Sequence, residues 1–442
     1  MLKTFPKGGV HPAENKLTSG KQIQQMSLPK VVYVPIAQHI GIPSEIIVEV
    51  KEKVTKNQVI AKSGGYVSSN IHSPVAGTVT KLDMIVDTRG YKKQCIVIRT
   101  DMNDVSNLDE ETFPLLKEIK LEPAEIVQRI TDCGIVGLGG ATFPSHVKLN
   151  VKEDVKIDCI IINGVECEPF LTADHRLMLE KAEEILIGIK ILMKARNVNR
   201  AIIGIEDNKR NAVELFKKLT VSEAGIQVAA LQVKYPQGGE KQLIRALLGR
   251  EVPKNRLPMD VGVIVHNVGT VFAIYQAVQF NKPLTERVVT VTGKNLEKAT
   301  NFWVKIGTPI KDLIEEVGGM PEGTRKIVNG GPMMGVAIKN TDVPVTKGTS
   351  GILFIAEEEA SRGIQQNCIR CGECVTVCPM GLEPHLLMNL TEKSMYERAL
   401  QEDILTCIEC GSCSYVCPAH RPLLDYIRFG KSIVKKLETA KN

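Results

Sequence analysis

A cysteine motif that occurs twice near the C-terminus constrains this chain more than any other feature. Residues 368–379 read CIRCGECVTVCP, and residues 407–418 read CIECGSCSYVCP. Both follow C-x2-C-x2-C-x3-C-P, a spacing that binds [4Fe–4S] clusters and in which the fourth cysteine of each run ligates the other cluster. The motif predicts two [4Fe–4S] clusters, with cluster 1 held by Cys368, Cys371, Cys374 and Cys417 and cluster 2 held by Cys407, Cys410, Cys413 and Cys378.

Two other uses of these cysteines are zinc knuckles and disulfides. Zinc needs four ligands per site and rarely uses this doubled spacing followed by proline. The remaining four cysteines have no ligand spacing and are interpreted as ordinary thiols; they are Cys95, Cys133, Cys159 and Cys167. Clusters and free thiols together indicate a reducing compartment.

Length and charge exclude several function classes. A chain of 442 residues is expected to form two to four domains. The net charge of +6 is spread along the sequence, which argues against a nucleic-acid-binding surface. The first ten residues, MLKTFPKGGV, lack the apolar region of a secretory signal. No apolar run reaches 18 residues, so we expect no transmembrane helix.

The pattern of apolar runs and turns predicts a multidomain α/β protein. Short β-type segments, among them residues 45–50, indicate a β-barrel or sandwich. Continuous apolar runs indicate a doubly wound parallel sheet, and they lie at 157–162, 201–205, 227–233 and 262–265. One helix is expected over 173–197. The predicted units are an N-terminal segment (1–28), the barrel or sandwich (29–100), a linker (101–120), the α/β domain (121–280), a small mixed α/β module (281–360) and an α-helical two-cluster ferredoxin domain (361–432).

The barrel contains the sequence IHSPVAGTV at residues 71–79, which resembles the turn of biotinyl and lipoyl domains. Those domains carry a prosthetic group on a lysine in an Ala-Met-Lys-Met sequence. This chain has Ala-Lys-Ser-Gly-Gly-Tyr at residues 61–66 instead. We therefore expect a structural module without a carrier lysine.

Polar residues and glycines follow the predicted strands of the α/β domain. In a parallel sheet, ligands bind beyond the carboxyl ends of the strands. Glycines there let backbone N–H groups approach a phosphate, and a lysine adds a positive charge. A tight turn and solvated loop carboxylates have similar local sequences, so these residues are candidates: Gly137, Gly139, Gly140, Lys148, Asn163, Glu166, Glu168, Gly239, Glu240, Asn267 and Thr270.

Taken together, these segments resemble the NADH-binding flavoprotein subunit of respiratory complex I. GLGGATFPSHVKL resembles GRGGAGFPTGLKW, NGVECEPFLTADHRLM resembles NADEGEPGTFKDRELM, YPQGGEKQLIRAL resembles YICGEETALMNSL, and HNVGT resembles NNVET. The resemblance implies non-covalent FMN at Gly137, Gly139, Gly140, Lys148, Asn163, Asn267 and Thr270. It implies a flavin and nicotinamide site at Glu166, Glu168 and Glu240, and Gly239 lies in the same loop. The chain departs from the pattern at Leu138, Thr142, His146, Val165 and Cys167.

The order of all segments resembles the RnfC subunit of the Rnf electron-transport complex over essentially the whole chain. That order is GGVHPAENK, the barrel, the flavoprotein core, a β-grasp module with GGPMMG, and the two cysteine runs. The resemblance implies a peripheral NADH/FMN/iron–sulfur subunit on the cytoplasmic face of the membrane. It also implies a ferredoxin:NAD⁺ oxidoreductase coupled to Na⁺ or H⁺ translocation, with a ferredoxin-like iron–sulfur subunit among the partners. Flavin exchanges one or two electrons, so no side-chain acid or base needs to act in the hydride step.

Three other functions remain open at this point. They are a cobalamin reductase of a bacterial microcompartment, the flavoprotein subunit of a soluble hydrogenase or formate dehydrogenase, and a non-catalytic electron relay without flavin. The nucleotide itself is predicted from Glu166 and Glu168, because a carboxylate accepts hydrogen bonds from ribose hydroxyls and repels the 2′-phosphate of NADPH. We therefore expect NADH to be preferred and Glu168→Gln to improve the use of NADPH.

Overall fold

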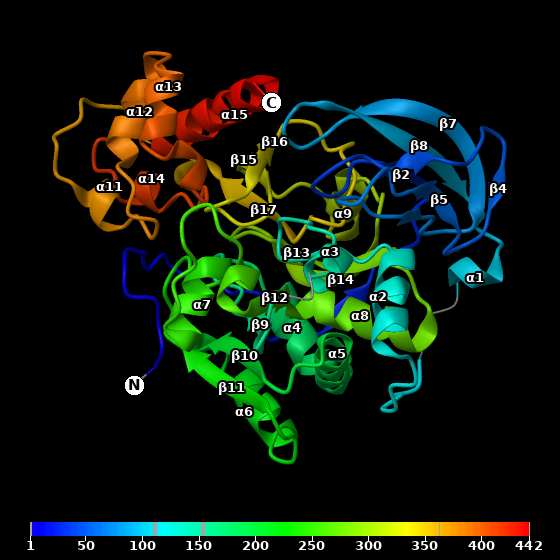
Figure 1. The fold of residues 1–442 in the computed structure, drawn as a ribbon. Helices are drawn as coiled ribbons and strands as arrows, with labels where there is room; N and C mark the ends of the chain where they lie inside the picture. The colour runs from blue at the N-terminus through cyan, green and yellow to red at the C-terminus, as the bar shows by residue number, and fades with distance from the viewer. Residues whose placement is uncertain (1, 109–112, 152–154, 362, 442) are drawn as a thin grey trace.

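The computed structural model describes residues 2–108, 113–151, 155–361 and 363–441. Figure 1 shows the cysteine-rich helical unit and the N-terminal barrel above the parallel-sheet unit, with a mixed sheet between them. The chain is therefore a multidomain α/β protein, as the sequence pattern predicts. No helix of the described residues has the length and apolar character needed to cross a bilayer.

The N-terminal barrel has two small antiparallel sheets. One has the order β2 (Val31–Pro35), β8 (Lys92–Thr100), β7 (Gly77–Val86) and β4 (Lys53–Val54), and the other has the order β3 (Glu45–Ile46), β5 (Val59–Lys62) and β6 (Ile71–His72). Their inner faces share one apolar core that includes Val32, Ile60 and Ile98. The strand expected at 45–50 ends at Ile46, and a turn follows in which the amide of Glu52 donates to the carbonyl oxygen of Glu49 at 3.2 Å and Lys51 is in the left-handed region, at φ +76°.

We call residues 121–280 the flavoprotein unit, after the resemblance noted in the sequence. It contains a four-stranded sheet in which every pairing is parallel. Its order is β11 (Ile226–Leu231), β10 (Ala201–Glu206), β9 (Cys159–Gly164) and β12 (Val263–Asn267). Alternate residues of β9 enter opposite cores, as the two-residue period of a strand requires. One core is covered by α2 (Pro123–Asp132), α5 (Ala182–Arg196), α6 (Arg210–Leu219) and α8 (Val268–Phe280), and the other by α7 (Glu240–Leu248).

The prediction of a single helix over 173–197 is wrong, because the structure has two helices there. They are α4 (Ala173–Glu180) and α5, separated at Lys181, whose φ of −132° and ψ of 34° are not helical. Asn197 ends α5 in the left-handed conformation that asparagine tolerates. The break lets α4 begin directly after the loop that follows β9.

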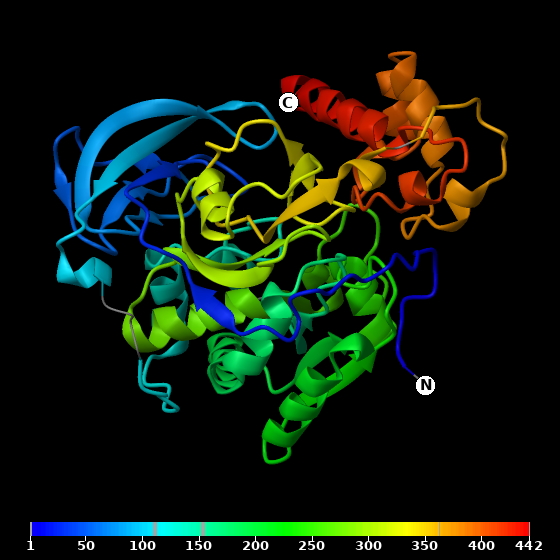
Figure 2. The same ribbon diagram turned by 180° about the vertical axis from the view of Figure 1, so that it is seen from behind.

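The central sheet is mixed and includes a strand from the N-terminal segment. Its order is β1 (Ile23–Gln25), β14 (Thr300–Lys305), β13 (Glu286–Thr292), β17 (Gly351–Ala356), β15 (Thr324–Asn329) and β16 (Val336–Ile338), and α9 (Ile310–Glu316) packs on it. β1 pairs in parallel with β14, with Ile23 opposite Asn301. The sequence pattern predicts a separate segment at residues 1–28, whereas Figure 2 shows the N-terminal segment crossing the flavoprotein unit before joining this sheet.

The C-terminal unit is helical, as predicted for a ferredoxin domain with a long spacer. It contains α11 (Glu373–Thr376), α12 (Pro384–Glu392), α13 (Tyr396–Gln401), α14 (Ser412–Val416) and α15 (Leu423–Lys441), the last extending beyond residue 432. The remaining helices are α1 (Val105–Leu108), α3 (Ser145–Leu149) and α10 (Glu357–Ala360). Residues 109–112 of the predicted linker lie outside the described residues.

Candidate functional site

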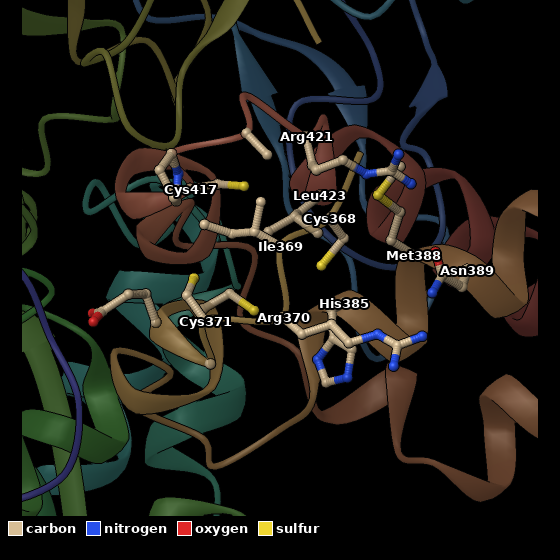
Figure 3. A pocket seen from close by; sticks show the side chains of 15 residues that line it. Cys368, Ile369, Arg370, Cys371, His385, Met388, Asn389, Cys417, Arg421 and Leu423 are labelled. Atoms are coloured by element: carbon tan, nitrogen blue, oxygen red, sulfur yellow. The ribbon is translucent and has the colours of Figure 1, made fainter. Parts of the chain in front are cut away.

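The cysteines assigned to cluster 1 surround one cavity of about 210 Å³. Cys368, Cys371, Cys374 and Cys417 line it together with Arg370, His385 and Arg421. Figure 3 shows the sulfur atoms of Cys368, Cys371 and Cys417 pointing into the same space. Cys368, Cys371 and Cys374 belong to the first motif, and Cys417 comes from the second.

The cysteines assigned to cluster 2 surround a second cavity with the opposite mixture of motifs. Cys407, Cys410 and Cys413 line it together with Cys378, the last cysteine of the first motif. All twelve cysteines of the chain are free thiols. Four thiols around each cavity form a donor set that fits a [4Fe–4S] group, because such clusters take four thiolate ligands.

The two cavities differ in their surroundings. Cys368 and Cys371 are exposed to solvent, whereas Cys378, Cys410 and Cys413 are buried. The second cavity adjoins the flavoprotein unit. The hydroxyl of Tyr235 donates to the backbone oxygen of Cys410 at 2.8 Å. Gln242 of α7 donates to the Sδ atom of Met380, two residues after Cys378, at 3.3 Å.

The glycine-rich loop 137–140 lies against the start of α8. Asn267 caps this helix, accepting from the amides of Gly269 and Thr270 at 2.9 and 3.3 Å. The amide of Leu138 donates to the Thr270 hydroxyl at 2.9 Å. A Cβ atom on Gly139 would lie 3.3 Å from Asn267, so only a residue without a side chain fits here comfortably. Three of the predicted FMN positions (Gly139, Asn267 and Thr270) therefore meet at the carboxyl end of β12, and Gly137 belongs to the same loop, where its amide donates to the carbonyl oxygen of Phe143 at 2.9 Å.

Gly140 is the open side of the same loop. Its φ is +108°, which favours glycine, and a Cβ atom there would meet no other atom within 4 Å. The carbonyl oxygen of Leu138 accepts from Arg287 of β13 at 3.4 Å, and Arg287 also donates to the Lys347 carbonyl oxygen at 2.5 Å. Burial lowers the pKa of Arg287 to about 10. The loop is thus supported from behind by a buried guanidinium and has free space at Gly140, which fits a phosphate-bearing ligand such as FMN.

Lys148 lies beside this loop on α3. Its Nζ atom donates to Glu240 Oε1 at 2.7 Å and to the backbone oxygen of Val265 at 3.0 Å. These contacts connect α3, the start of α7 and the middle of β12. The structure therefore brings Lys148 and Glu240 together beside β12, and their contact with a ligand stays a prediction.

Asn163 and Glu166 organise the loop that follows β9. Asn163 donates from Nδ2 to the carbonyl oxygen of Gly238 at 2.9 Å, which joins this loop to the one before α7. The Glu166 carboxylate accepts from the amides of Asp174 and His175, at 2.8 and 3.1 Å, at the start of α4. Asp174 in turn accepts from Asn267 at 2.6 Å. Burial and the nearby Glu166 raise the pKa of Asp174.

Glu168 points to a different place from the other candidates. Its carboxylate accepts from the amides of Met333 and Met334 at 3.1 and 2.7 Å, in the loop between β15 and β16. Desolvation raises the pKa of this carboxylate to about 7, although these two amides and Tyr235 oppose the shift. Because both oxygens are engaged by protein amides, a contact between Glu168 and a dinucleotide remains a prediction.

Sequence reasoning missed two lysines that contact the same loop, the partly buried Lys16 and the buried Lys209. Lys16 donates from Nζ to the backbone oxygens of Glu166, Glu168 and Leu171 at 2.8, 2.8 and 2.7 Å. Lys209 donates to the backbone oxygen of Val165 at 2.7 Å. Burial, reinforced by Lys209, lowers the pKa of Lys16 to about 8. The only sequence signal is the presence of Lys16 in GGVHPAENK, since its partners are about 150 residues away.

Family models match four segments of the chain. They are the RnfC barrel sandwich hybrid domain at residues 3–103, the Nuo51 FMN-binding domain at 130–276, the SLBB domain at 288–337 and the 4Fe-4S dicluster domain at 357–421. Curated relatives cover the chain almost completely. A subunit of the proton-translocating ferredoxin:NAD(+) oxidoreductase complex of Clostridium ljungdahlii is 46% identical over 98% of this chain and 94% of its own.

The chain belongs to the RnfC family. Another RnfC relative, from the Na(+)-translocating ferredoxin:NAD(+) oxidoreductase complex of Acetobacterium woodii, is 41% identical over 96% of both chains. A third, from the ion-translocating oxidoreductase complex of Rhodobacter capsulatus, is 40% identical over 100% of this RnfC chain and 85% of its own. This RnfC chain is therefore an oxidoreductase subunit of a multisubunit ion-translocating complex, with FMN-binding and iron–sulfur domains.

A solved structure shares the fold of this RnfC chain. The air-oxidised NAD⁺-reducing [NiFe]-hydrogenase matches with a TM-score of 0.52 and 18% identity, over 71% of this chain and 63% of that chain. The likeness concerns the fold alone. The fit with a multidomain α/β architecture agrees with the fold class predicted from the sequence.

Proposed function

We propose that this chain exchanges hydride with NAD(H) at an FMN held in the flavoprotein unit and passes single electrons through two [4Fe–4S] clusters. The observation that carries the proposal is the contact between the Tyr235 hydroxyl and the Cys410 carbonyl, at 2.8 Å. It joins the loop before α7 directly to the second cysteine cavity. A flavin site and a cluster site would thus be adjacent in one chain.

The protein residues supply binding and position. The loop 137–140 and Lys148 would hold the FMN phosphate, because backbone amides and an ammonium group bind phosphate. Asn163, Asn267 and the loop ending at Glu240 would line the flavin and dinucleotide. When bound, FMN supplies the exchange between one hydride and two single electrons.

The burial of the cysteines favours an order for the clusters. Cluster 2, on Cys378, Cys407, Cys410 and Cys413, is buried against the flavoprotein unit and would exchange electrons with the flavin. Cluster 1 has exposed ligands in Cys368 and Cys371 and would exchange electrons with a partner. A ferredoxin-like iron–sulfur subunit of the complex is the partner that this chemistry suits.

We also propose that the complex couples this reaction to Na⁺ or H⁺ translocation through its other subunits, as the names of the relatives state for their complexes. The chain would lie on the cytoplasmic face of the membrane as a peripheral subunit. NAD(H) and reduced thiols are both available in that compartment.

Anaerobic reconstitution tests the proposal directly. We expect about eight iron and eight sulfide per chain, with one FMN released on denaturation. NADH should reduce the flavin before the clusters in a stopped-flow experiment. A chain that binds both clusters but no FMN would instead be a non-catalytic relay, and the proposal would be wrong.

A further inference from the structure

The sequence GGPMMG at residues 330–335 contains none of the candidate site residues and meets them only at Glu168. It connects β15 to β16 and closes on itself, because the amide of Gly335 donates to the carbonyl oxygen of Gly331 at 2.9 Å. Two consecutive amides, those of Met333 and Met334, point to the carboxylate of Glu168. The loop is therefore a small backbone site for an anion, and Glu168 of the flavoprotein unit fills it.

A glycine is needed at position 331 because the Glu168 carboxylate leaves no room for a side chain, and not because of the backbone angles. A Cβ atom on Gly331 would lie 2.2 Å from Glu168 Oε2, a distance that no pair of non-bonded atoms tolerates. The φ of Gly331 is outside the left-handed region, so alanine is compatible with the backbone itself. The absence of a side chain at Gly331 thus allows the Glu168 carboxylate to approach the loop closely.

The opposite side of the loop touches the segment that carries cluster 2. A Cβ atom on Gly411 would lie 2.7 Å from the carbonyl oxygen of Met333. Met333 packs against Tyr235 and Cys410 in one apolar cluster. On the same side, Arg428 of α15 donates to the carbonyl oxygen of Met334 at 2.9 Å. The loop 330–335 therefore lies between the flavoprotein unit and the second cysteine motif and contacts both.

We propose that Glu168 is a positioning residue whose carboxylate anchors the loop 330–335 and thereby fixes cluster 2 relative to the flavin. The electron-transfer part of this inference rests on the function proposed above. Hydrogen bonds from amides to a carboxylate are among the stronger ones in proteins. Losing one of these hydrogen bonds changes the equilibrium ratio between the loop bound to Glu168 and the loop released from it by about tenfold or more.

Gly331→Ala is the sharpest test, because it displaces the Glu168 carboxylate and removes no charge or cofactor contact. Gly20→Ala is the matched control, since a Cβ atom there would meet no other atom within 4 Å and its φ is ordinary. In Gly331→Ala we expect wild-type FMN and iron content and unchanged reduction of flavin by NADH. Electron transfer from flavin to cluster 2 should be about tenfold slower, and the control should match the wild type.

Hydrogen exchange provides a readout that does not depend on turnover. The amides of Met333 and Met334 should be protected in the wild type and exchange faster in Gly331→Ala. Glu168→Gln, which keeps one acceptor oxygen and the side-chain size, should give an intermediate effect in both measurements and serves if the alanine variant does not fold.

The outcomes separate the two proposals. Equal exchange of these amides in the wild type and in Gly331→Ala would overturn the anchoring. Faster exchange with unchanged electron transfer would overturn the positioning role. A wild-type chain that protects these amides but binds no FMN would overturn the proposed function and the electron-transfer role with it, while the anchoring would stand.

Discussion

Replacing Lys148 with methionine tests the assignment of the FMN phosphate site. The Lys148 ammonium is shared in the structure between Glu240, at 2.7 Å, and the Val265 carbonyl oxygen, at 3.0 Å. A hydrogen bond from an ammonium to a phosphate contributes about 1.5–3 kcal/mol. Lys148→Met keeps most of the apolar stem and removes that bond, so we expect FMN to bind about 10- to 100-fold more weakly.

Glu240→Gln distinguishes a loss of phosphate binding from a loss of local structure. Side chains of the Lys148–Glu240 pair are 27% and 39% exposed, and such pairs contribute about 0.2–1 kcal/mol. Releasing the lysine from this carboxylate should therefore leave FMN affinity unchanged or increase it by up to about fivefold.

Fluorescence quenching on titration of flavin-free protein with FMN gives the dissociation constants of both variants and of the double mutant. Lys241→Met is the matched control, because the Lys241 ammonium donates to the Pro253 carbonyl oxygen, in an exposed contact on α7. Wild-type affinity in Lys148→Met, or a greater loss in Glu240→Gln than in Lys148→Met, would refute the assignment.

Three further tests concern the clusters, a buried lysine and the choice of nucleotide. Cys378→Ser should damage cluster 2, on the second motif, and Cys417→Ser should damage cluster 1, on the first. Iron content and electron paramagnetic resonance measure the loss of each cluster, and the reverse result would overturn the ligand pairing. Burial lowers the pKa of Lys347 to about 7, so the folded chain releases this proton near pH 7 and the unfolded chain near pH 10.5. Between pH 7 and pH 9 the unfolded chain therefore binds one proton more than the folded chain, and the free energy of unfolding should rise by about 2–3 kcal/mol as the pH increases. Urea unfolding at several pH values measures this rise, and an equal pH dependence in the wild type and in Lys347→Met would contradict it. NADH should reduce the flavin roughly a hundredfold faster than NADPH, because the Glu166 carboxylate follows β9 and would repel the 2′-phosphate of NADPH. Equal stopped-flow rates for the two nucleotides would contradict this prediction.

The buried elements of the fold were predictable because their sequence pattern is local. All four strands of the parallel sheet lie within two residues of the predicted ends at each terminus. Continuous apolar runs mark strands that are covered on both faces, and the polar residues after these runs predict a ligand-binding edge. The start of helix α2 also has local sequence signals, since Pro123 begins it and Glu125 accepts from the amide of Glu122 at 2.7 Å.

The contacts between units were not predictable, because no local pattern encodes them. Glu168 has the same sequence context as a nucleotide-binding carboxylate, yet it meets amides that are 165 and 166 residues later in the chain. Lys16 reads as a solvated lysine in a polar segment and is in fact surrounded by carbonyl oxygens. In both cases the side chain's partner is backbone, which any sequence can supply.

The pairing of β1 with β14 has a consequence for the way this chain is synthesised. Ile23 and Asn301 are partners, so the early strand emerges 278 residues before the strand beside which it must lie. At about 5–20 residues per second, the ribosome takes roughly 14–56 s to cover that distance. During this interval the flavoprotein unit can complete its own sheet and pair with Lys3 at Leu231, while β1 still lacks its partner strand. Closure of such a distant pair is slow, so β1 is expected to join the central sheet last.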